Sequence, residues 1–208
     1  MKKIAMLLFL VMVSVLPGLA ANDAQNTVAP VQNDIDAARL PDGEYAAAFS
    51  PEAVTANGST LTLSGVHIFT QDRYDAADID ALEVGDVIIV EGEPVPVLKL
   101  DREDGITINE DEDARAFDLV KTEDSDAYVV RGFNGLTTYS ERGIIDLAVD
   151  ASATFTDGWD IDAGPVTVGF GDIAEAITTS ENHSFTQDNT TVRVRSGRVV
   201  AILRAFMP

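Results

Sequence analysis

The sequence contains acidic segments in which the spacing of the carboxylates suits a calcium ion. Calcium binds several oxygen ligands that one loop brings together. Four segments offer such ligands, at residues 101–104, 109–113, 123–126 and 157–162. The last is the strongest candidate, because Asp157, Asp160 and Asp162 flank a glycine that permits a sharp turn. The segment lacks the EF-hand pattern of alternating acids closed by a glutamate at the twelfth position. It is therefore either a calcium site or an acidic turn that faces the solvent.

A second candidate site is an arginine-rich hairpin near the end of the sequence. If Ser196-Gly197 forms a two-residue turn, Arg195 lies opposite Arg198, and Arg193 lies opposite Val200. Like charges that face each other across two strands destabilise a sheet, so we expect an anionic group nearby. One alternative is an adjacent strand that presents Asp or Glu. The other is an anionic ligand, such as a carboxylate or a sulfated sugar, bound by the guanidinium groups of Arg193, Arg195 and Arg198.

The two histidines lie in nearly identical hexapeptides, His67–Asp72 and His183–Asp188. The first copy precedes a predicted helix and the second follows one, and no similarity of fixed period extends outward, so we interpret the match as coincidence. Two histidines without a third ligand at a recognised spacing do not define a zinc site. We expect His67 to pack beside a strand and His183 to lie in a loop.

The sequence carries none of the short motifs of nucleophilic catalysis. It has no cysteine, no Gly-x-Ser-x-Gly, no Ser-x-x-Lys and no His-Glu-x-x-His. A Ser-His-Asp triad or a glycosidase carboxylate pair is defined by its geometry in the fold. The 35 acidic residues therefore identify neither, and we favour a protein that is not an enzyme.

The N-terminal residues have the pattern of a secretory signal peptide. Lys2 and Lys3 precede an apolar stretch at 4–16, and Gly18-Leu19-Ala20 forms a small-x-small cleavage signal. We predict that residues 1–20 are removed after Ala20. The alternative, a membrane anchor, is disfavoured because the apolar stretch is shorter than the roughly 20 residues that span a bilayer. The absence of cysteine excludes a bacterial lipoprotein, so we expect a secreted, periplasmic or cell-surface protein.

The chain is strongly acidic. Its formal net charge is −21, and loss of the two lysines with the signal peptide would make it −23. Such a surface repels phosphate backbones and anionic lipid headgroups, which argues against nucleic-acid and peripheral membrane binding. It favours cationic partners and divalent metals, unless the charge serves solubility alone.

Closely spaced turn signals leave room for strands and little else. They recur from Pro41-Asp42-Gly43 to Ser196-Gly197, with apolar residues alternating between them. We predict an all-β fold of about ten short antiparallel strands, arranged as a sandwich or as paired small barrels, with two short helical insertions. The predicted parts are a flexible leader at 21–38 and a single domain at 39–208, or two interlocked sub-barrels at 39–122 and 127–208.

Individual elements can be placed within this fold. Val87–Val90 is apolar on both faces and suits a central strand, whereas Pro94 and Pro96 confine the next run to an edge or a bulge. This hairpin, with Gly85-Asp86 before its apolar strand, resembles the hairpins of small SH3-like barrels. The helical insertions are predicted to begin at Asp75 and at Asp172, where an acid follows three residues later.

These observations favour an exported, non-catalytic binding or interaction module whose ligand is a cell-surface glycan or a cationic partner. Such a module needs a shallow patch with an exposed aromatic side chain, for which Trp159 and Tyr139 are the candidates. One alternative is a small secreted hydrolase that uses paired carboxylates. The other is a passive envelope component.

Overall fold

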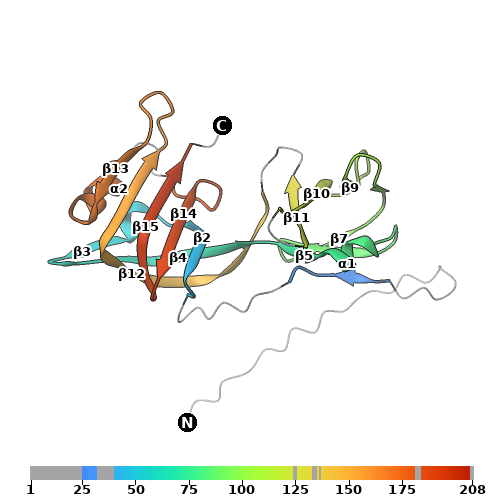
Figure 1. Ribbon diagram of the computed structural model, residues 1–208, viewed down its shortest axis with the longest axis horizontal. Helices are drawn as coiled ribbons and strands as arrows, with labels where there is room; N and C mark the ends of the chain where they lie inside the picture. Colours follow the sequence, from blue (N-terminus) through green and yellow to red (C-terminus); the bar gives the residue numbers. More distant parts are fainter. Residues whose placement is uncertain are drawn as a thin grey trace, which may run out of the picture.

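The computed structural model describes residues 25–31, 40–123, 126–132, 135, 137–180 and 184–206. The predicted signal peptide at 1–20 lies outside these residues. Fifteen strands and two short α-helices are present in the described part, so the predicted all-β class with two helical insertions is confirmed. The strands are more numerous than predicted, and two of them, β4 and β12, are long. They run between two lobes, each of which has its own buried core (Figure 1).

The first lobe is built on one seven-stranded sheet of order β13-β12-β15-β14-β2-β4-β3. Its strands are β2 (Gly43–Ala48), β3 (Val54–Asn57), β4 (Thr60–Gln71), β12 (Tyr139–Gly158), β13 (Val166–Gly169), β14 (Thr190–Arg195) and β15 (Arg198–Ala205). The sheet closes on itself, because β12 pairs with β15 along its second half and with β4 along its first half. The β12–β15 pairing is parallel, which differs from the antiparallel arrangement expected.

The closed sheet surrounds an apolar core. Alternate residues of the strands point inward, among them Leu63, Phe155 and Ile202. Helix α2 (Ile173–Thr179) follows the short 3-10 turn η2 (Phe170–Asp172), and a second such turn, η1 (Pro51–Ala53), precedes β3. Ile173 and Ile177 of α2 are fully buried, as expected for two residues four apart on one face of a helix. Asp172 makes no side-chain capping bond, however, so the capping prediction is wrong there.

The second lobe is inserted between β4 and β12, and its core lies between two sheets. One sheet has the order β1-β6-β7 and the other the order β5-β11-β10-β9-β8. The elements are β1 (Thr27–Val28), β5 (Arg73–Asp75), α1 (Ala76–Asp80), β6 (Val87–Val90), β7 (Glu93–Pro96), β8 (Leu100–Asp101), β9 (Ile106–Ile108), β10 (Phe117–Lys121) and β11 (Ala127–Gly132). Asp75 caps α1 by accepting a hydrogen bond from the Ala77 amide at 2.9 Å, as predicted.

The predicted hairpin of the inserted lobe is confirmed. Strand β6 is the central strand of its sheet, and β7, which carries both prolines, is an edge strand. The turn between them is Glu91-Gly92, whose φ angles of 54° and 80° both lie in the left-handed region. Two such residues give the turn a twist that matches the flanking strands.

Part of the predicted flexible leader is ordered. Thr27 and Val28 pair in parallel with Val87 and Ile88, and Val28 is only 3% exposed. Two residues of the predicted leader therefore form a short strand. Its single buried valine was too weak a pattern to reveal a strand that is stabilised by pairing with distant residues.

The division of the chain also differs from the predicted sub-barrels at 39–122 and 127–208. That boundary falls inside a hairpin, because β10 and β11 pair with Val120 opposite Val129. Strands from both halves of the sequence build the seven-stranded sheet, and the inserted lobe interrupts them. Turn signals do not reveal that one lobe is inserted into another. A turn has the same sequence pattern whether or not the chain later returns to the sheet that it leaves.

Candidate functional site

In β4, a bulge in the middle of the strand reverses which residues, odd-numbered or even-numbered, point toward the core. Leu61 and Leu63 are buried before it, and Val66 and Ile68 are buried after it. The reversal occurs at Gly65, whose φ of 65° lies in the left-handed region that favours glycine and whose amide donates to the Asp146 carboxylate at 2.8 Å. Beyond the bulge, odd-numbered residues therefore point away from the core.

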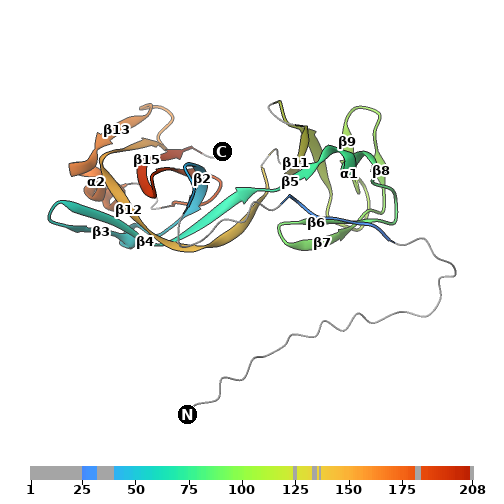
Figure 2. The same ribbon diagram turned by 60° about the horizontal axis from the view of Figure 1, so that its bottom comes forward.

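These outward residues form one side of a groove where β4 leaves the first lobe for the inserted lobe. Phe69, Gln71 and Arg73 line the groove from β4 and β5. Tyr139 lies directly opposite Gln71 on β12 and lines it as well, as does Glu44 on β2. The groove has a volume of about 580 Å³. Two views show that β4 and β12 connect the lobes at this place (Figures 1 and 2).

The charges around the groove are unevenly paired. Glu44 accepts a hydrogen bond at 2.7 Å from Nε of Arg193, its register partner on β14, so its charge is neutralised. Arg73 is exposed, and within the described residues no carboxylate lies within 4 Å of its guanidinium group. The groove therefore combines aromatic rings and an amide with the positive charge of Arg73, which no described carboxylate compensates.

The hydroxyl group of Tyr139 stays protonated at neutral pH. Burial raises its pKa, and the negative charge of Asp188 raises it further, while a hydrogen bond with the Thr137 side chain acts in the opposite direction. Tyr139 is half-buried, with its ring on the groove wall. It can thus present both an apolar ring face and a hydroxyl donor to a ligand.

The predicted arginine hairpin forms, but two of its three candidate arginines pair with acids of the same chain. Arg193 pairs with Glu44, and Arg198 lies 3.5 Å from the Asp150 carboxylate and donates to the Val149 carbonyl at 3.0 Å. Arg195 is exposed and lies opposite Arg198. Internal pairing is therefore the alternative that the geometry supports for Arg193 and Arg198.

The register of the hairpin is partly as predicted. Arg195 faces Arg198, and Val194 faces Val199. Arg193 lies opposite Ala201 and not Val200, because the ladder shifts by one residue between Arg193 and Val194. A bulge of this kind accommodates one extra residue on β15, and the turn residues gave no sign of it.

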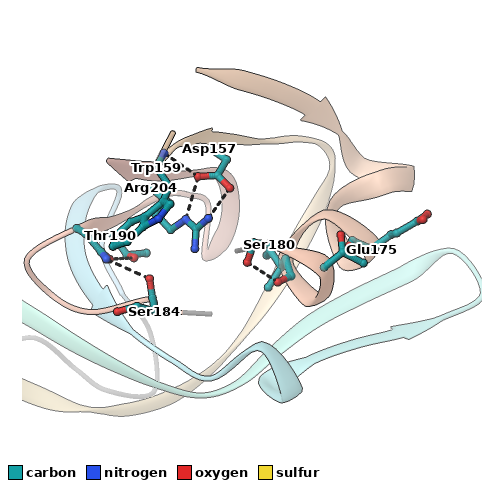
Figure 3. A network of polar contacts seen from close by, with 10 residues as sticks. Asp157, Trp159, Glu175, Ser180, Ser184, Thr190 and Arg204 are labelled. Atoms are coloured by element: carbon teal, nitrogen blue, oxygen red, sulfur yellow. Dashed lines mark hydrogen bonds and ion pairs between the residues drawn. The ribbon is translucent and has the colours of Figure 1, made fainter. Parts of the chain in front are cut away.

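The last arginine of the hairpin, Arg204, lies at the centre of a buried network (Figure 3). It is 2% exposed and donates two hydrogen bonds to the Asp157 carboxylate, at 2.9 and 2.6 Å. Its guanidinium carbon lies 5.3 Å from the Trp159 ring and 4.8 Å from the Phe185 ring. Asp157 and Trp159, predicted for metal or ligand binding, thus both interact with an arginine that lies 47 residues after Asp157 in sequence.

The structure does not bring the three predicted calcium ligands together. Both carboxylate oxygens of Asp157 accept hydrogen bonds from Arg204. Asp160 accepts hydrogen bonds at 3.0 Å from the amides of Asp162 and Ala163, which closes the turn. Among the residues that the structure describes, no three His, Asp or Glu side chains are placed to hold a metal ion.

Of the two histidines, the structure describes only His67. His67 lies on the outer face of β4, half-buried, with Nδ1 2.7 Å from the Glu141 carboxylate. It borders an open hollow that is also lined by Ser50 and Ser184. His183 lies outside the described residues, so its predicted position in a loop stays a prediction.

Acidic groups also meet where the lobes join. Burial raises the pKa of the Asp188 carboxyl, and the negative charge of Glu91 in the inserted lobe raises it further. Glu91 forms an ion pair with Arg115, and its amide donates to the fully buried Asp72 carboxylate at 2.9 Å. Asp72 also lies 3.8 Å from the Arg142 guanidinium group, which helps to compensate its buried charge.

Comparisons with protein-family models, with curated proteins and with solved structures found no match. In the described part of the chain, none of the helices has the length and hydropathy needed to cross a lipid bilayer. The interpretation of the groove therefore depends on its own geometry and charge.

Sequence reasoning missed Phe69, Gln71 and Arg73 as candidate binding residues. They alternate along the chain at a spacing of two, but all four residues from Phe69 to Asp72 also belong to a repeated hexapeptide that drew attention to His67. The signal that could have identified them is Gly65, because a glycine inside a strand marks the place where the outward face reverses.

Proposed function

We propose that this chain is an exported, non-catalytic binding module and that the groove between its lobes is the ligand site. The observation that carries the proposal is the outer face of the β4–β5 segment. Phe69, Gln71 and Arg73 follow one another along it, and Tyr139 stands beside them. Strands hold these side chains at fixed spacings, so a ligand meets a preformed surface.

A cell-surface glycan is the ligand class that this surface suits best. Sugar rings have an apolar face that can stack on an aromatic ring and hydroxyl groups that bond to amides and guanidinium groups. The groove offers both, through Tyr139 and Phe69 on one hand and Gln71 and Arg73 on the other. A cationic partner suits it less, because among the described groove residues Arg73 is the charged side chain without an ion-pair partner.

Export is part of the proposal, and the N-terminal pattern supports it. If residues 1–20 are a signal peptide, the native protein begins at Ala21 and lies outside the cytoplasm. Cell fractionation followed by sequencing of the protein's N-terminus tests this point. An intact Met1 on protein from the cytoplasmic fraction would contradict it.

Retention of the full chain on cell-wall polysaccharide tests the binding function. We expect Gln71→Ala and Tyr139→Ala each to weaken retention about tenfold, since each removes a contact of roughly 1–2 kcal/mol. Arg131→Gln is the matched control, because Arg131 is exposed on β11 and does not line the groove. Unchanged urea midpoints would show that the variants still fold.

The proposal fails if the wild-type chain is not retained on any cell-wall fraction. It also fails if both groove variants are retained as strongly as the wild type. Retention that Arg131→Gln weakens as much as the groove variants would show that binding occurs elsewhere or without specificity.

A small hydrolase with paired carboxylates has one observation in its favour, the Asp188 carboxyl with its raised pKa beside Glu91. A general acid needs a raised pKa and a general base an ionised carboxylate, so unequal partners suit glycoside hydrolysis. Release of reducing sugar from the retained polysaccharide, lost in Asp188→Asn, would favour this function. Retention without any release of sugar would favour the binding module.

A further inference from the structure

We infer that the groove recognises a sugar that carries a single carboxylate, such as a terminal uronic acid, and that Arg73 binds that carboxylate. This inference rests on the proposed binding function and adds the chemistry of its ligand. It starts from the pairing of arginines in a chain with 35 acidic and 14 basic residues.

Arginines in so acidic a chain readily find acidic partners. Among the described residues, Arg115, Arg193 and Arg204 each form an ion pair with a carboxylate less than 3 Å away. Arg102 instead donates to the carbonyl groups of Ile79 and Leu82 at the end of α1. The guanidinium groups of these four arginines therefore already have partners within the chain.

Arg73 differs from these arginines in its surroundings. It lines a groove, it is exposed, and no described carboxylate lies within 4 Å of it. Glu44, which shares the groove, is already bound by Arg193. An anion that enters the groove therefore meets a guanidinium group that no described carboxylate binds.

The shape of the guanidinium group favours a carboxylate, because its planar array of donors can hold both oxygens of one carboxylate at once. The nearby rings of Phe69 and Tyr139 add an apolar surface on which a pyranose ring can lie. A uronic acid joins these two features in one residue, with its carboxylate at the edge of the ring.

The net charge of the chain limits the ligand to few charges. At −21, the protein repels polyanions over distances of about 10 Å at moderate salt. A heavily sulfated chain would therefore be opposed by the surface as a whole, whereas one carboxylate is opposed little and gains the local bond to Arg73. The ligand is thus a glycan that is uncharged except for a single uronic acid at its end.

Calorimetric titration of the full chain tests this assignment with two probes. One is an oligosaccharide of neutral sugars with a glucuronic acid at its end. The other is the same oligosaccharide with glucose in place of the glucuronic acid. We expect the wild type to bind the acidic probe about tenfold more tightly at low salt. The preference should shrink as salt rises, and Arg73→Gln should abolish it while Arg131→Gln keeps it.

Three results would overturn the inference. The wild type could bind both probes equally, Arg73→Gln could retain the preference, or free acetate could compete as well as the acidic probe. In the last case the site would recognise a carboxylate without the sugar.

The same titration separates this inference from the proposed function. If Tyr139→Ala weakens binding of both probes but Arg73→Gln leaves the preference intact, the groove is the binding site and the carboxylate assignment is wrong. If both variants bind both probes as the wild type does, the proposed function itself is wrong.

Discussion

Two arginines, Arg204 and Arg73, show how one residue type can have two different roles in this molecule. Arg204 is buried between Trp159 and Phe185, and the Asp157 carboxylate occupies two of its donors. Arg73 is exposed in a groove with aromatic walls and has no carboxylate within 4 Å among the described residues. Burial requires a partner for a charge, whereas a binding surface keeps its donors available.

We expect the buried Arg204–Asp157 pair to contribute more to the free energy of unfolding than the exposed ion pairs do. Asp157→Ala removes the carboxylate that accepts two hydrogen bonds from the buried Arg204 guanidinium group, so we expect a loss of about 3–5 kcal/mol in the free energy of unfolding. Urea denaturation measures it. Glu44→Ala is the control, because its ion pair with Arg193 is exposed and should contribute at most about 1 kcal/mol. Equal losses in the two variants would contradict the contrast between buried and exposed pairs.

The bulge that exposes the groove face should also be measurable. Gly65→Ala places a side chain at a φ of 65°, which costs about 1 kcal/mol even though open space surrounds the site. Gly169→Ala is the matched control, because Gly169 also faces open space but lacks a positive φ. We expect it to change the free energy of unfolding by less than about 0.5 kcal/mol. A harmless Gly65→Ala would mean that the bulge does not depend on this glycine.

The acidic junction between the lobes predicts a smaller, pH-dependent effect. The pKa of Asp188 is raised in the folded protein, so its ionised form is disfavoured there and folding is penalised at neutral pH. The penalty disappears as the pH falls through the folded pKa toward the ordinary value of 3.8. Asp188→Asn should therefore stabilise the protein at pH 7, and because Asp188 is exposed the gain should stay below about 1 kcal/mol.

Thermal denaturation of the wild type and Asp188→Asn at pH 7 and at pH 3.5 measures that gain. The two proteins should differ at pH 7 and melt together at pH 3.5. A difference that grows on acidification would have the opposite sign and would refute the assignment.

The smallest expected effect on stability is at Arg73. An exposed arginine without a carboxylate partner contributes little to folding, so Arg73→Gln should change the free energy of unfolding by less than about 0.5 kcal/mol. Urea denaturation beside the Asp157→Ala variant checks this value. A loss above 1 kcal/mol would show that Arg73 has a structural role and would weaken the contrast with Arg204.

Local patterns predicted much of the fold. Alternating apolar residues and turn signals identified strands, and two prolines identified β7 as an edge. These features depend on neighbours in sequence, which is why they can be predicted. The parallel pairing of Val28 with Ile88 and the return of β12 to β4 join segments far apart in sequence, and no local pattern specifies them.

The candidate site was harder to predict than the fold. Asp157 and Trp159 stood out by residue type, yet their surroundings were decided by Arg204, 47 residues further along the chain. Gln71 and Arg73 did not stand out in the sequence. They matter because both line the groove where the lobes join, and because the described fold places no carboxylate within 4 Å of Arg73. Residue type indicates what a side chain can do, while the fold decides whether its capacity is already used.

Amide hydrogen exchange of the full chain with and without cell-wall polysaccharide tests the central claim most directly, because it locates the ligand on the protein. We expect the ligand to slow exchange at residues 69–73 and around Tyr139, and to leave the hairpin turn at 195–198, which does not line the groove, unchanged. Protection confined to that turn, or to the Asp157 turn, would place the binding site elsewhere and contradict the proposed function.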